Sequence, residues 1–200
     1  MPSPAAIYYT TVQQAFNAYC GRPGDAAGVR FWAEYLLANG GDVEDMITDF
    51  ANSAESLALY GPINATTIGS AIDKMYLQMF GRLPDAAGKA FYIAEFTSGN
   101  LSAGQVAWAI YQGAQNSDAV MLQNKLTASN TFTQIQDGRT YAADDFGTGT
   151  VFNATYAGDA DANTARTWLT AVTANPTTIP STAQTVTFIK GSIANAGDPI

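Results

Sequence analysis

Three oxygen-bearing side chains late in the chain alternate with alanines: Asp159, Asp161 and Asn163. Calcium-binding loops place their ligand oxygens at alternate positions, so this stretch is a candidate calcium site. An EF-hand loop would also need a glycine at its sixth position and a glutamate at its twelfth. Thr164 and Thr170 occupy those positions, which excludes an EF-hand. Two interpretations stay open: a cap for the following helix, and a calcium site of a looser kind.

The residue types that most enzymes use for catalysis are scarce. The chain contains no histidine, which removes the commonest general base and any serine–histidine mechanism. No carboxylate pair lies in a recognisable glycosidase frame, and no hydrolase or nucleotide-binding motif is present. The one cysteine, Cys20, excludes an internal disulfide bond, and we expect it to be a small buried side chain. We therefore expect a protein without enzymatic activity; a polysaccharide-processing enzyme is the least favoured alternative.

The chain is acidic, with a formal net charge of −8. It has no basic stripe that could neutralise phosphates, so we expect no nucleic-acid partner. An anionic membrane would attract it only through a bridging cation, and an acidic polysaccharide only through its neutral sugars or through shared divalent cations. No run of about 18 apolar residues is present, so we expect no transmembrane segment. The first four residues, Met1 to Pro4, do not resemble a signal peptide.

One stretch of the chain occurs twice. Residues Gly21–Phe31 and Gly81–Phe91 are offset by sixty positions and are identical at seven of eleven positions. Apolar residues on both sides of the stretch also match at the same offset. Chance does not produce this agreement, so the first 120 or so residues are two copies of one unit.

Each copy predicts a helix, a tight turn and a second helix. Gly21 and Gly81 follow apolar helical stripes and suit the left-handed residue that ends a helix. Asp25 and Asp85 then stand where a side-chain oxygen caps the next helix and complements its positive end. The repetition favours a structural role for these turn residues, because a binding site need not occur twice.

A functional interpretation of the turn stays open beside the structural one. Arg22 and Arg82 could bridge the turn aspartates or bond the last carbonyls of the preceding helix, or they could form an exposed site for a sugar or an ion. We expect Trp32 and Trp168 in the core, and Trp108 exposed, because it lies off the apolar face of its helix. The candidate ligand-binding residues are Trp108, Arg22, Asp25, Arg82 and Asp85.

The apolar periodicity predicts an all-α fold throughout. We expect a duplicated helical domain over 1–130, with copies at about 5–61 and 65–120 packed as a multi-helix bundle. A smaller helical tail over 131–200 should carry two helices, joined by a linker at 175–180, and lead to a downstream region. Two stretches of the tail read as loops, Asp137–Gly138 and Asp144–Gly149, and Asp144 with Asp145 is a weaker calcium candidate.

The repeated Gly-Arg-x-Pro-Asp-x-x-Gly pattern resembles a helical domain found near the N-termini of large bacterial surface proteins with RTX-type calcium repeats. It is also similar to the N-terminal anchoring region of Gram-negative S-layer proteins. The resemblance covers residues 8–120 and short segments of the tail up to Arg166. Copy one departs from the pattern at Pro23–Gly24, and copy two at Phe91–Tyr92, where the tryptophan is missing.

The resemblance implies type I secretion and a place in the S-layer at the cell surface. It implies attachment to lipopolysaccharide, assisted by calcium, and self-assembly of the full-length protein into a lattice. A similar pattern in phycobilisome linkers implies the alternative of a non-catalytic protein–protein scaffold.

Overall fold

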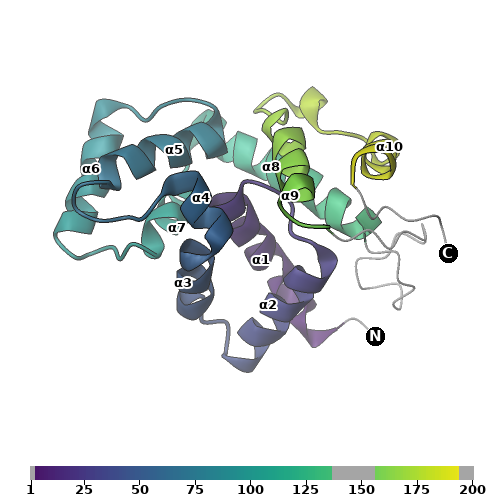
Figure 1. Ribbon diagram of the computed structural model, residues 1–200, viewed down its shortest axis with the longest axis horizontal. Coiled ribbons are helices and arrows are strands. Elements are labelled where there is room, and N and C mark those ends of the chain that lie inside the picture. Colours follow the sequence, from purple (N-terminus) through teal and green to yellow (C-terminus); the bar gives the residue numbers. More distant parts are fainter. Residues whose placement is uncertain (1–2, 137–155, 194–200) are drawn as a thin grey trace.

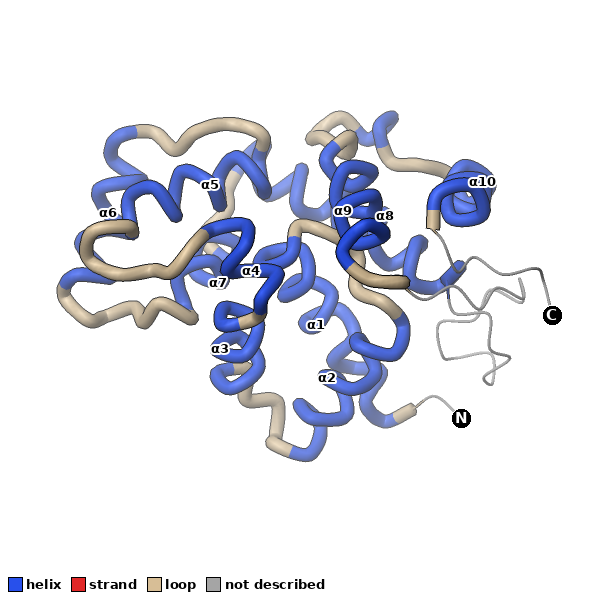
Figure 2. Tube along the Cα trace, in the orientation of Figure 1, coloured by secondary structure: helices blue, strands red, loops and turns tan. Residues whose placement is uncertain are grey.

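A computed structural model describes residues 3–136 and 156–193 of the chain. Within these residues every regular element is a helix, as Figure 2 shows. The predicted all-α fold is confirmed. None of the described helices is long and apolar enough to cross a membrane.

The first copy, called unit one below, extends from the N-terminal helix to Tyr60. Its first helix is continuous and changes from 3₁₀ through α to π geometry along its length. It ends at Gly21, which adopts a left-handed φ of 63°. The elements of unit one are a 3₁₀ helix (Pro4–Tyr8), α1 (Tyr9–Ala15), a π-helical turn (Phe16–Cys20), α2 (Ala26–Ala38), α3 (Glu44–Asn52) and α4 (Ala54–Tyr60).

The second copy, unit two, repeats this order and lies beside unit one in Figure 1. Its helices are α5 (Ile68–Phe80), α6 (Ala86–Thr97), α7 (Gln105–Gln112) and the first turns of α8 (Asn116–Gln136). Helix α8 continues through residue 130 without a break, so it connects unit two to the tail.

The caps predicted from the repeat are confirmed in both copies. Gly81 ends α5 with a left-handed φ of 66°. The Asp25 carboxylate accepts a hydrogen bond from the Gly28 amide at the start of α2, at 2.8 Å. The Asp85 carboxylate accepts the corresponding bond from Gly88 at the same distance. The two aspartates therefore satisfy N–H groups that the first turn of a helix leaves free.

The two units share one hydrophobic core. It contains α1 and α2 residues such as Val12 and Leu36 together with α5 and α7 residues such as Ile72 and Ile110, all of them fully buried. Hydrogen bonds also cross between the units, since the Tyr19 hydroxyl donates to the carbonyl of Gly104. The two units are therefore packed into one body and are not two separate domains.

The tail packs on the second half of α8. Its elements are α9 (Asp159–Thr170), a 3₁₀ turn (Pro176–Thr178) and α10 (Thr182–Ser192), and the 3₁₀ turn occupies the predicted linker. Buried Phe132 of α8 contacts Trp168 of α9 and Phe188 of α10, with ring centroids 5.2 and 6.3 Å apart. The predicted loops at 137–138 and 144–149 lie outside the described residues.

Candidate functional site

Two equivalent clefts lie beside the repeated turns, one in each unit. The unit-one cleft has a volume of about 200 Å³ and the unit-two cleft about 600 Å³. Residues at the same offset of sixty line both: Phe16 and Tyr76, Arg22 and Arg82, Trp32 and Tyr92. The repeat therefore duplicates a cleft as well as a turn.

The turn arginine of unit one forms a bidentate ion pair with Glu55 in the first turn of α4. Its Nε and Nη2 atoms lie 2.8 and 2.9 Å from the two carboxylate oxygens. Its third donor, Nη1, binds the carbonyl of Pro23 at 3.0 Å. Both predicted partners were therefore wrong: Arg22 bridges neither Asp25 nor the carbonyls that end the preceding helix. The guanidinium instead reaches across to α4, and its one bond close along the chain goes to the Pro23 carbonyl.

The turn arginine of unit two repeats the arrangement with a different acid. Arg82 binds Asp118 in the first turn of α8, with Nε and Nη2 at 3.3 and 2.5 Å from the carboxylate oxygens. Its Nη1 binds the carbonyl of Leu83 at 2.9 Å. The guanidinium lies over the ring of Tyr76, as that of Arg22 lies over Phe16. Here too the prediction of a bond to Asp85 was wrong.

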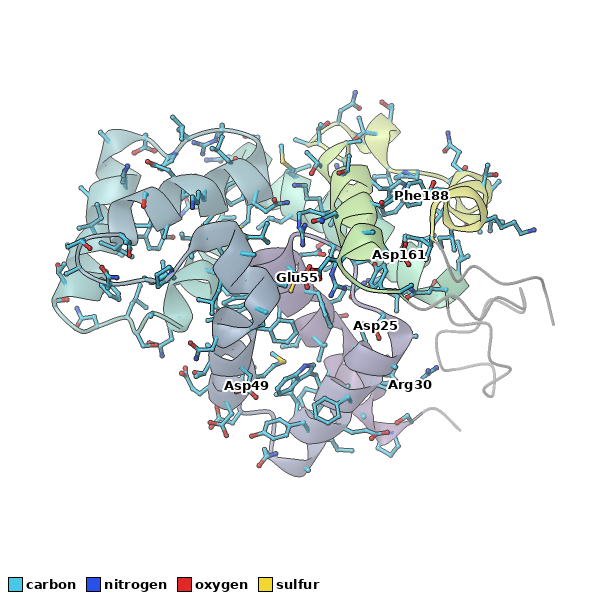
Figure 3. All side chains as sticks on the ribbon, in the orientation of Figure 1. Asp25, Arg30, Asp49, Glu55, Asp161 and Phe188 are labelled. Carbon is cyan, nitrogen blue, oxygen red and sulfur yellow. The ribbon has the colours of Figure 1, made fainter. Side chains whose placement is uncertain are left out.

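The two arginines differ in what covers them. In unit one the ring of Tyr156 lies 4.6 Å from the Arg22 guanidinium carbon, and the Tyr156 hydroxyl donates to the Pro23 carbonyl at 3.0 Å. Arg166 of α9 binds the same Glu55 and also the Cys20 carbonyl. The side chain of Arg22 is consequently 10% exposed, against 48% for Arg82. Figure 3 shows Glu55 between α4 and α9.

The electrostatics of unit one follow from this packing. Burial alone would raise the pKa of Glu55, but the bonds and charges of Arg22 and Arg166 outweigh it and hold that pKa below its ordinary value. Burial would lower the pKa of Arg22, and the bond to Glu55 reverses the direction. Burial raises the pKa of the Cys20 thiol, which keeps it protonated and unreactive. The expectation of a small buried cysteine is confirmed.

An aromatic row lies along α2 at the edge of the unit-one cleft; we call Phe31, Trp32 and Tyr35 the aromatic row. Neighbouring rings meet edge to face, with centroids 5.2 and 5.5 Å apart. Phe31 is 62% exposed, and the other two rings are partly buried. The Tyr35 hydroxyl donates to exposed Asp45 at 2.7 Å, and Asp49 lines the same cleft. Figure 3 labels Asp49 on α3.

Trp108 occupies a different place from the one predicted. It is partly buried against the shared core and stacks on Tyr111, with ring centroids 6.2 Å apart. The expected exposure was wrong because α7 buries a wider face than Val106 and Ile110 alone, one that also includes Ala107 and Tyr111. The exposed aromatic rings of the two units are Phe31 and Phe91.

The three calcium candidates lie within α9 and not in a loop. Helical geometry places Asp159 and Asn163 on one face, where both border a small cavity, and Asp161 on another. Buried Asp161 accepts a hydrogen bond from the Ala157 amide at 2.7 Å, and Asn163 accepts one from Arg166. The described residues contain no group of three acidic or thiol side chains that could hold a metal ion. Asp161 thus fixes the backbone that precedes α9 to the first turn of that helix.

Sequence reasoning missed the partners of the turn arginines. Glu55 and Asp118 lie 33 and 36 residues beyond their arginines, and only folding shows that they meet. A local signal was available. Each acid follows an Asn-Ser pair at a helix start: Ser53 of the first pair caps α4, and Asn116 of the second begins α8. Tyr156 and Arg166 carry no such signal.

Comparisons with family models, with curated proteins and with solved structures give no match to this chain. The interpretation of the clefts therefore depends on their own geometry and chemistry.

Proposed function

We propose that this chain is a non-catalytic attachment module of a secreted, S-layer-type or RTX-type surface protein, and that it binds cell-surface polysaccharide. The observation that carries the proposal is the aromatic row beside the unit-one cleft. Aromatic rings offer flat apolar faces, and neighbouring carboxylates accept hydrogen bonds from hydroxyl groups. A sugar presents both an apolar ring face and hydroxyl donors, so the row and the carboxylates of Asp45 and Asp49 suit it.

The charge of the chain restricts the sugar. A formal charge of −8 repels an acidic polysaccharide such as lipopolysaccharide unless the contact is with neutral sugars or a divalent cation bridges the two surfaces. Exposed carboxylates on α3 can share such an ion with the polysaccharide. Calcium therefore enters the proposal as a bridging ion. Binding by one module should be weak, and many modules in a lattice would strengthen it.

The test is co-sedimentation of the full chain with purified lipopolysaccharide, in calcium and in chelator. Phe31→Ala removes an exposed ring at little cost in stability and should weaken binding by about tenfold. Phe91→Ala is the matched control, because Phe91 occupies the same position in unit two, where Glu95 replaces the third ring of the row. Equal binding by the two variants would contradict the assignment of the site.

Trp108 provides a second comparison within the same experiment. Its partly buried ring is the other candidate platform, and it lies on α7, outside the aromatic row. If Trp108→Ala weakens sedimentation in the folded protein while Phe31→Ala does not, the polysaccharide site belongs to unit two.

A further inference from the structure

The turn arginines of the two units differ in one respect: the tail packs on Arg22 of unit one, whereas Arg82 of unit two is half exposed. In unit one the tail supplies two groups to the turn. Tyr156 lies over the guanidinium of Arg22 and donates to the carbonyl of Pro23. Arg166 places a second guanidinium against Glu55 and the Cys20 carbonyl. One tyrosine and one arginine, ten residues apart and mostly joined by helix α9, thus complete the site.

Unit two carries the same receiving groups. Arg82 takes the place of Arg22, Asp118 that of Glu55, and the Leu83 carbonyl that of the Pro23 carbonyl. The Arg82 guanidinium carbon lies 5.6 Å from the ring centroid of Tyr76 and 6.0 Å from that of Phe80, and the Arg82 side chain is 48% exposed. Both rings belong to α5, and none of the described residues of the tail places a ring over Arg82 as Tyr156 does over Arg22.

Exposed apolar side chains accompany these groups. Phe91 lines the cleft and is 56% exposed, and Leu83, next to Arg82, is 57% exposed. Large apolar side chains that remain in water near one cleft are typical of a protein-binding surface.

We propose that the unit-two cleft binds a helical segment of another protein, which places a tyrosine on Arg82 and an arginine on Asp118. The tyrosine ring stacks on the guanidinium and its hydroxyl donates to the Leu83 carbonyl. Two carboxylates, Asp85 and Asp118, and one cation, Arg82, line the cleft. The arginine of the bound segment supplies a second positive charge, which balances the two carboxylates. The apolar side of the segment covers Leu83 and Phe91. The cleft has about three times the volume of its unit-one counterpart, which leaves room for both side chains.

A peptide with the sequence of residues 156–170 is a ready-made probe, because it carries both groups at the required spacing. The full chain already fills its unit-one site with its own tail, so a labelled peptide added in excess has the unit-two cleft left to bind. Fluorescence anisotropy should show saturable binding at micromolar concentrations. Arg82→Met should weaken that binding by about tenfold or more. Lys74→Met removes one exposed positive charge from α5, the helix that precedes Arg82, and should leave the binding unchanged.

Two peptide variants and one protein variant address the chemistry of the contact. A peptide with alanine in place of its arginine, and another with alanine in place of its tyrosine, should each bind about tenfold more weakly to the wild-type chain. Leu83→Arg should also weaken binding, because it places a charge where the apolar side of the peptide packs. Circular dichroism would establish that each protein variant is folded.

Three results would overturn the proposal. The first is a dissociation constant weaker than about 1 mM for the wild-type chain. The second is equal binding to wild type and Arg82→Met, which would mean that the peptide displaces the tail from unit one. The third is binding of a sugar or a phosphate, and not of the peptide, at the unit-two cleft.

Discussion

At the scale of single residues, Glu55 and Asp118 perform the same task in different surroundings. Both hold the arginine of a repeated turn, but Glu55 also holds Arg166. Glu55→Gln would leave the buried guanidinium of Arg22 without a counter-charge, and we expect it to lower the free energy of unfolding by about 3 kcal/mol. Urea unfolding followed by circular dichroism measures the loss.

Asp118→Asn is the matched control for that substitution. The Arg82 side chain is half exposed, so water screens the pair and solvates the arginine when its partner is neutral. We expect a loss below about 1 kcal/mol. Similar losses for the two variants would mean that the tail contributes nothing to the Glu55 site.

The turn aspartates make a second prediction at this scale. Asp25→Ala and Asp85→Ala each remove the acceptor of a helix N–H group, so each should cost about 1 kcal/mol in the free energy of unfolding. Asp25→Asn and Asp85→Asn keep a capping oxygen and should cost less. If the alanine variants unfolded at the wild-type urea concentration but lost polysaccharide binding, the aspartates would be ligand-binding residues and not caps.

Local chemistry allowed part of the site to be predicted from the sequence. The roles of Gly21 and Asp25 depend on neighbours within a few residues, and the repeat states them twice. The partner of Arg22 depends on how α4 packs, 33 residues away. The Asn-Ser pair before Glu55 marks the start of a helix, but it does not show which arginine this acid meets. Trp108 shows the same limit, because its burial depends on which helices surround α7.

At the scale of elements, the C-terminal end of α5 depends on a buried lysine from α8. The Lys125 ammonium donates to the carbonyls of Gln78 and Met79, at 3.1 and 2.8 Å, and so satisfies groups that the helix end leaves free. Burial lowers the pKa of Lys125 to about 8, against about 10.4 in an unfolded chain. Between these values the unfolded chain holds more protons, so this lysine makes stability rise with pH.

Cys20 opposes that trend, because its raised pKa makes the unfolded chain lose a proton first. The useful quantity is therefore the difference in unfolding free energy between wild type and Lys125→Met. As the pH rises from 8 to 10, the unfolding free energy of wild type should increase relative to that of Lys125→Met by at most about 1.4 kcal/mol per pH unit. Urea unfolding at three pH values in this range measures it. A constant difference would show that Lys125 titrates alike in both states.

Most element boundaries were accessible from the sequence because glycines and capping residues mark them. Ser53 caps α4, and Ser181 with Gln184 forms a capping box at α10. The stretch from Asp159 to Asn163 was ambiguous, since alternating oxygens suit a calcium loop and the first turns of a helix equally. In the structure this stretch is helical, and Ala165 and Leu169 of the same helix pack against α8. The apolar periodicity of so few residues could not predict that packing.

At the scale of the whole molecule, duplication supplied two copies of one cleft, and the tail distinguished them. Unit one keeps the aromatic row and receives the tail on its turn, whereas none of the described residues of the tail contacts Arg82, whose side chain is 48% exposed. The sequence revealed the duplication but not this asymmetry, because the tail residues that cause it are distant from the repeat and do not resemble it. Our two proposals assign different partners to the two units for this reason.

The last prediction concerns how these parts unfold. One tryptophan lies in each part: Trp32 in unit one, Trp108 in unit two and Trp168 in the tail. The shared core joins the units, and the Arg166–Glu55 pair joins the tail to unit one, so breaking one part exposes apolar or charged groups of the next. Three variants that each keep one tryptophan, with phenylalanine at the other two positions, should therefore unfold at the same urea concentration within each variant, whether followed by fluorescence or by circular dichroism. An earlier fluorescence change for Trp168 alone would show that the tail unfolds independently, and it would remove the tail as a fixed cover of the unit-one turn.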